Sequence, residues 1–243
     1  MVVTTTGIAF TTIAIGLTGC GLWFLQAARN TNRFEKDKKI GFLLTLFFLG
    51  FAIANGAVGV SGIFFVDSPL AMYGATVVSN LALAILSVFG PYTAYYIFFP
   101  KKSVSLHMLS LVALAFLTIA TTVIEQPWPF LTAQNTIDPN LSPFLSLLMF
   151  LVLFFGVGSA LYIFTRLFLE ASVVKVKMLA LIIALLALGG VVHAFIRYVL
   201  LRSATAGTRS LFQDVSIGVM GVVFLTAFII QPFLKRLFSK TWK

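Results

Sequence analysis

The stretch FLLTLFFLGFAIANGAVGVSGIFF, residues 42–65, decides the fold class, because it holds no Asp, Glu, Lys or Arg over its whole length. An α-helix needs roughly 20 apolar residues to cross about 30 Å of hydrocarbon, so this stretch is long enough to span a membrane. Small side chains let helix backbones approach one another closely in lipid, so we expect this helix inside a bundle. The small residues are Gly50, Ala54, Gly56, Gly59, Ser61 and Gly62.

The rest of the chain has the same character. Of its 243 residues, 60% are hydrophobic and only 10% are charged, and the mean hydropathy is +1.04. A soluble domain averages about 45–50% apolar and about 25% charged residues. The composition therefore predicts an integral membrane protein, and we expect any reactive groups to lie within the membrane or at its surfaces.

Seven segments are apolar enough to span a bilayer, and most of the loops between them are short. We therefore expect an all-α membrane protein, with a seven-transmembrane helix bundle as one domain over residues 1–231. In the remaining residues, 232–243, apolar and basic side chains alternate after Pro232, which is typical of a short amphipathic helix at the membrane interface. The seven segments are approximately 7–28, 40–65, 75–99, 104–124, 143–165, 178–200 and 211–231.

The distribution of basic residues predicts the orientation of the bundle. With the N-terminus outside and the C-terminus cytoplasmic, 14 of the 17 Lys and Arg residues lie on the inner side. The inner side then carries a net charge of +11 and the outer side −1. We therefore expect the plasma (cytoplasmic) membrane as the location and anionic membrane lipids as partners, and we expect no nucleic acid to bind.

Several polar residues fall in the predicted outer half of the bundle. His193 and Arg197 are four residues apart in the sixth segment, which places them on one face of an α-helix. A charged group within a membrane is costly and usually marks a functional site. If these faces point inward, they form an outward-facing ligand pocket in which Asp214 pairs with Arg197. The candidate ligand-binding residues are His193, Arg197, Asp214, Asn55, Asn80 and Glu125.

A structural role also explains the same residues. Arg197 and Asp214 can form an interhelical salt bridge at the level of the lipid headgroups, and His193 and Asn55 can hydrogen-bond between helices. Both interpretations stay open at the level of sequence.

Other chemistry has little support in the sequence. His107 is predicted at the opposite end of the bundle from His193, and no cluster of His, Cys, Asp or Glu has ligand spacing. No lysine occurs between Lys177 and Lys235, so a retinal Schiff base in the last helix is disfavoured. No arrangement of a nucleophile with a base is evident. We therefore expect no enzymatic activity, no metal and no cofactor.

The layout resembles the seven-helix sensor modules of microbial histidine kinases. The similar features are a basic first inner loop, ARNTNRFEKDKK (28–39), and a basic entry into the sixth segment, SVVKVKMLALIIALL (172–186). The resemblance implies a receptor-like or sensor function, with a small or lipophilic ligand bound from outside and a cytoplasmic signalling partner. Two alternatives remain: an accessory or scaffold subunit of a larger membrane complex, and a small transporter or channel.

Overall fold

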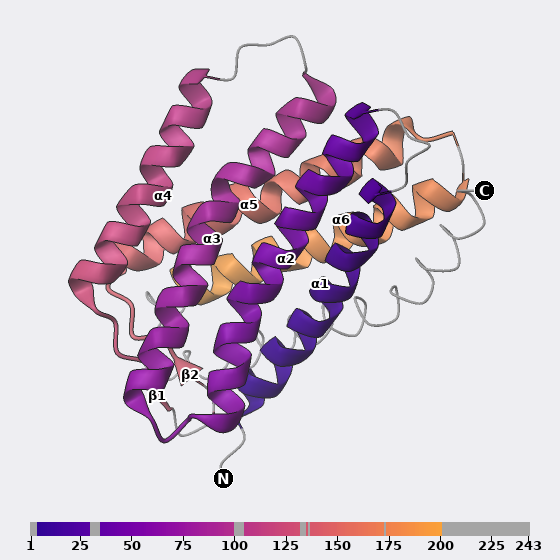
Figure 1. Ribbon diagram of the computed structural model, residues 1–243. Coiled ribbons are helices and arrows are strands. Elements are labelled where there is room, and N and C mark those ends of the chain that lie inside the picture. The colour runs from indigo at the N-terminus through magenta and orange to yellow at the C-terminus, as the bar shows by residue number, and fades with distance from the viewer. Residues whose placement is uncertain are drawn as a thin grey trace.

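A computed structural model gives the arrangement of the chain, and it describes residues 4–29, 35–99, 105–131, 135, 137–172 and 174–200. Helices dominate this part of the chain (Figure 1). The elements are α1 (Thr5–Arg29), α2 (Glu35–Phe64), α3 (Pro69–Phe98), α4 (Ser105–Glu125), β1 (Phe130–Leu131), β2 (Ile137–Asp138), α5 (Pro143–Glu170), α6 (Val174–Phe195) and the π-helical turn η1 (Ile196–Leu200).

The first six predicted segments are confirmed as helices. Within the described residues, six helices are long and apolar enough to cross a membrane, the last of them running from α6 through η1. The prediction of an all-helical chain suited to a membrane is therefore confirmed. The seventh segment (211–231) and the amphipathic tail (232–243) lie outside the described residues and stay predictions, as do the orientation and the identity of the membrane.

The helices pack mainly against their neighbours in the chain. Helix α1 lies along α2, and α2 lies along α3, so these three helices form one layer (Figure 1). Helix α5 packs against α3 and α6, and α4 covers the flank of α3 and α5. We call the end that carries β1 and β2 the ribbon end, and the opposite end, where α1 finishes and α2 starts, the basic end.

Local sequence explains where two helices begin. Ser68 and Ser142 precede α3 and α5, and their hydroxyl groups accept hydrogen bonds from the N–H groups of Ala71 and Leu145, at 3.4 Å and 3.0 Å. Each serine is followed by a proline, whose missing N–H costs nothing at the first helical position. The Ser-Pro pairs thus set the N-termini of both helices.

Glycines allow the closest helix approach in the bundle, between α1 and α2. A Cβ atom at Gly59 would lie 2.4 Å from the backbone nitrogen of Thr11, and one at Gly62 would lie 2.9 Å from Cα of Gly7. These distances leave no room for a side chain, so the expectation that small residues mark a packing face is confirmed for α2.

The burial pattern suits a protein surrounded by lipid. Apolar side chains such as Leu145, Met149 and Val152 are fully buried in the middle of the bundle. Other apolar side chains point outward, and Phe116 and Ile124 of α4 are 72% and 79% exposed. An apolar outer surface of this kind is stable only against hydrocarbon or another apolar surface.

The loop after α4 folds back over the ribbon end of the bundle. Phe130 pairs with Asp138 and Leu131 pairs with Ile137 in an antiparallel arrangement. The N–H of Thr5 also donates a hydrogen bond to the carbonyl of Asn135 at 3.2 Å. The ribbon is therefore attached to the start of α1.

Candidate functional site

Arg197 lies where three elements meet at the ribbon end. It belongs to η1, and its Nη2 atom donates a hydrogen bond to the backbone carbonyl of Ile137 in β2 at 3.2 Å. Its guanidinium carbon lies 5.7 Å from the centre of the Phe10 ring in α1, in a cation–π arrangement. Arg197 therefore links the end of the sixth span to the ribbon and to α1.

The helix changes geometry at this point. The α-helical hydrogen bonding of α6 ends at Phe195, and the next five residues form the wider π-helical turn. Such turns are rare and occur frequently at functional sites. The four-residue spacing of His193 and Arg197 was interpreted with regular α-helical geometry, but the two residues lie on either side of this change. The side chain of His193 is buried.

Ile137 is the centre of the contacts around Arg197. Its carbonyl accepts from Arg197, and its N–H donates to the hydroxyl of Thr6 at 3.1 Å. Its side chain packs close to Gly62 of α2. Both backbone groups of one residue thus hold the ribbon to α1 and η1. The sequence contains no signal for this arrangement, because backbone atoms make the contacts.

Thr4 completes the attachment of α1 to α2 at the same end. Its hydroxyl accepts from the N–H of Gly7 at 2.9 Å and donates to the carbonyl of Gly62 at 2.8 Å. The first contact satisfies an N–H group at the start of α1. The second joins two helices, so the threonine both starts α1 and fixes it against α2.

Asn80 makes an interhelical contact elsewhere in the bundle. It is buried in α3, and its Nδ2 atom donates to the hydroxyl of Thr122 in α4 at 3.3 Å. The Thr122 hydroxyl donates in turn to the carbonyl of Thr118 at 2.8 Å. This chain of hydrogen bonds satisfies polar groups that would otherwise be costly in an apolar interior.

The remaining candidate residues have different surroundings. Asn55 donates to the carbonyl of Phe51, one turn earlier in its own helix, at 2.7 Å. Glu125 ends α4 and is exposed. Three candidate residues thus have three different hydrogen-bond partners: Asn55 bonds to Phe51, Asn80 to Thr122 and Arg197 to Ile137. Asp214 and its predicted pairing with Arg197 lie outside the described residues.

Metal binding was not expected from the sequence. Among the described residues, no group of three or more His, Cys, Asp and Glu side chains is arranged to hold a metal ion. His107 lies in the first turn of α4, near the basic end.

The described part of the chain thus contains six helices suited to a membrane and a polar junction at the ribbon end. No family model, no curated protein and no solved structure matches the chain. Its function is therefore inferred from the geometry of its own residues.

Proposed function

We propose that the protein is a receptor-like, non-enzymatic membrane protein that binds a small or lipophilic ligand at the ribbon end, which is predicted to face outward. The observation that supports this proposal best is the position of the Arg197 guanidinium between Phe10 and the carbonyl of Ile137. The proposed site is centred on Arg197. Asn55 and Asn80, whose amide groups donate to Phe51 and Thr122, stay candidate residues.

The chemistry of Arg197 favours a ligand with an anionic group. A guanidinium group carries five N–H donors in a planar fork that fits a carboxylate or phosphate. Within the described residues it donates one hydrogen bond, to an uncharged carbonyl oxygen. A carboxylate or phosphate can accept two parallel hydrogen bonds from the guanidinium and adds charge–charge attraction, neither of which a carbonyl oxygen offers. An anionic ligand can therefore replace Ile137 as the partner of Arg197.

Such a replacement gives the ligand a way to change the structure. The hydrogen bond from Arg197 to Ile137 is one of the contacts that join η1 to the ribbon. A ligand shifts a conformational equilibrium only if it binds one state better than the other. A ligand that takes over Arg197 favours the state in which the ribbon and the end of the sixth span separate. This separation is the proposed signal to a partner.

A second candidate function is that of an accessory or scaffold subunit. The hydrogen bond between Asn80 and Thr122 favours it, because both side chains are buried and serve helix packing. The exposed apolar face of α4, with Phe116 and Ile124, is compatible with a neighbouring subunit as well as with lipid. Transport remains a third prediction, although the buried side chains of Met149 and Val152 leave an apolar middle to the bundle.

Native mass spectrometry of the protein, extracted from its own membrane in mild detergent, tests these functions. We expect a small bound mass on the protein and its loss in Arg197→Gln. Arg166→Gln is the matched control, because Arg166 also lies over a ring, that of Phe98 at 5.6 Å, but at the basic end. A bound mass other than a phospholipid that survives Arg197→Gln contradicts the proposed site. A defined set of other subunits favours the accessory function.

The nature of the ligand is tested with two probes of equal chain length, one with an anionic and one with a neutral headgroup. Laurate and dodecanol have the same chain length, and only laurate is an anion. We expect laurate, but not dodecanol, to raise the melting temperature of the wild type, because ligand binding to the folded state stabilises it. The effect should disappear in Arg197→Gln. Equal stabilisation by both probes would show that Arg197 does not select an anion.

A further inference from the structure

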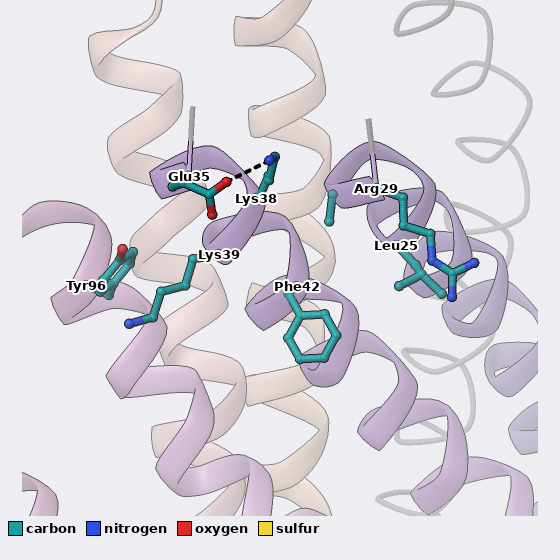
Figure 2. Close-up of a pocket in the computed structure, with 8 residues that line it drawn as sticks. Leu25, Arg29, Glu35, Lys38, Lys39, Phe42 and Tyr96 are labelled. Atoms are coloured by element: carbon teal, nitrogen blue, oxygen red, sulfur yellow. Dashed lines mark hydrogen bonds and ion pairs between the residues drawn. The ribbon is translucent and has the colours of Figure 1, made fainter. Parts of the chain in front are cut away.

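A second site lies at the basic end, far along the bundle from Arg197. A pocket of about 580 Å³ opens there between the end of α1, the start of α2 and the last turns of α3. Figure 2 shows the side chains around it. It is lined by Leu25, Ala28, Arg29, Glu35, Lys38, Lys39, Phe42 and Tyr96.

The pocket has an excess of positive charge. Three cationic side chains and one carboxylate line it, which leaves a net charge of +2. Lys38 is paired with Glu35 at 2.7 Å. Lys39 extends toward Tyr96 instead, with its Nζ atom 4.5 Å from the centre of the ring (Figure 2). Arg29 and Lys39 are both exposed, so an anion can reach them.

The apolar part of the pocket lies toward the membrane spans. Leu25 is close to the end of the first span, Thr5–Gln26, and Phe42 belongs to the span Lys38–Phe64. The Phe42 side chain is 50% exposed. Tyr96 is near the end of the third span, where tyrosine is common at the boundary between headgroups and acyl chains. The pocket thus has cations at headgroup level and apolar side chains next to the acyl chains.

We propose that this pocket binds the phosphate group of an anionic phospholipid. Lys39 contacts the phosphate oxygens as a point charge. The Arg29 side chain points away from Lys39 (Figure 2), and its positive charge attracts the phosphate from a distance. Leu25 and Phe42 contact the start of an acyl chain. A phospholipid fits both halves of the pocket, whereas a free phosphate ion uses only the charged half. Glu35 opposes binding, because its carboxylate neutralises Lys38 and repels the phosphate.

The experiment measures lipid retention by the full chain. Phosphatidylglycerol or phosphatidylcholine is added to the purified protein in detergent, and native mass spectrometry quantifies the lipid that stays bound. We expect preferential retention of phosphatidylglycerol. The double variant Arg29→Gln/Lys39→Gln should weaken it by about 25-fold, which is about fivefold for each cation removed.

A matched double variant separates a defined site from general attraction to positive charge. Arg166→Gln/Lys177→Gln removes the same charge from side chains that also lie over rings, those of Phe98 and Phe168, but that do not line the pocket. We expect this variant to retain phosphatidylglycerol like the wild type. Equal losses in the two double variants would overturn the proposal.

A variant that is expected to increase lipid retention excludes misfolding as the cause of the losses. The Glu35 side chain is 89% exposed, so Glu35→Gln should leave folding intact. It should increase retention of phosphatidylglycerol by up to about fivefold, because it removes the opposing carboxylate. Unchanged or weaker retention would contradict the proposal. Displacement of the lipid by millimolar inorganic phosphate would assign the pocket to a soluble anion instead.

Discussion

Nη2 of Arg197 lies 3.2 Å from the backbone carbonyl oxygen of Ile137, a residue 60 positions earlier in the chain. The same residue donates its N–H to Thr6. The ends of three chain segments are therefore joined through the backbone of one residue, Ile137. This junction joins η1, the ribbon and α1 through two hydrogen bonds. Stability measurements can test whether these contacts hold the ribbon end together.

Loss of the Arg197 side-chain contact should destabilise the bundle. We expect Arg197→Gln to lower the free energy of unfolding by about 1–3 kcal/mol, since a hydrogen bond from a charged donor to the ribbon is lost. Thermal unfolding in detergent measures this change. Arg166→Gln should cost at most about 1 kcal/mol, because Arg166 pairs with Glu170 on the exposed surface. Equal effects of the two substitutions would contradict the structural role of Arg197.

Arg197 and Thr6 should behave as a coupled pair. Both side chains hold the backbone of Ile137, so removal of either one weakens the same attachment of the ribbon. We expect the double variant Arg197→Gln/Thr6→Val to cost less than the sum of the two single variants, by about 0.5 kcal/mol or more. A double-mutant cycle on melting curves measures this. Strict additivity would mean that the two side chains act independently.

The close contact between α1 and α2 predicts a strong effect of small substitutions. Gly59→Ala places a methyl group 2.4 Å from the nitrogen of Thr11, and we expect a loss of about 1–3 kcal/mol through overpacking. Gly74→Ala is the matched control, because its Cβ would meet no atom within 4 Å. That change should be neutral or stabilising by up to about 1 kcal/mol, since alanine favours helix. Similar melting temperatures for the two variants would disprove the close approach.

The contact between Asn80 and Thr122 should contribute a modest pairwise energy. Interhelical hydrogen bonds in membrane proteins couple by about 0.6 kcal/mol on average, with a maximum of about 1.7 kcal/mol. We expect a coupling in this range from the cycle of Asn80→Leu and Thr122→Val. Asn55→Leu should show no coupling to Thr122→Val, because Asn55 bonds within its own helix. Coupling of Asn55 to Thr122 would require a different helix arrangement.

The predicted orientation is tested by cysteine labelling. The natural Cys20 is first replaced by serine, and a single cysteine is then introduced by Asp67→Cys, between α2 and α3, or by Ser172→Cys, between α5 and α6. Both positions are exposed. We expect a membrane-impermeant maleimide to label the first variant in intact cells and the second only after permeabilisation. The reverse pattern would invert the bundle and move the basic end outward.

Sequence reasoning was most successful for the helices themselves. The thickness of the hydrocarbon layer sets the length of a span, and the lack of water forces the backbone into helices. These constraints act locally, so the run 42–65 predicted most of α2. The start of the third segment was predicted less well, at residue 75, whereas α3 begins at Pro69 after the Ser68 cap.

The candidate site was less accessible to such reasoning. A side chain such as Asn55 or Asn80 is equally polar in the sequence, yet one bonds to its own helix and the other to α4. The spacing of His193 and Arg197 did not reveal the π-helical turn that begins at Ile196. The rotation of each helix about its own axis decides these contacts. The sequence of a membrane helix gives little information on that rotation, because its lipid-facing and core-facing sides are both apolar.

The sequence by itself thus determined that the chain forms long apolar helices, because hydrocarbon thickness and backbone hydrogen bonding depend only on local composition. The tertiary structure alone decided that Arg197 meets Ile137 and that Lys39 meets Tyr96. Those pairs join residues far apart in the chain, and only the packing of α1, α2 and α3 and the return of the ribbon bring them within contact distance.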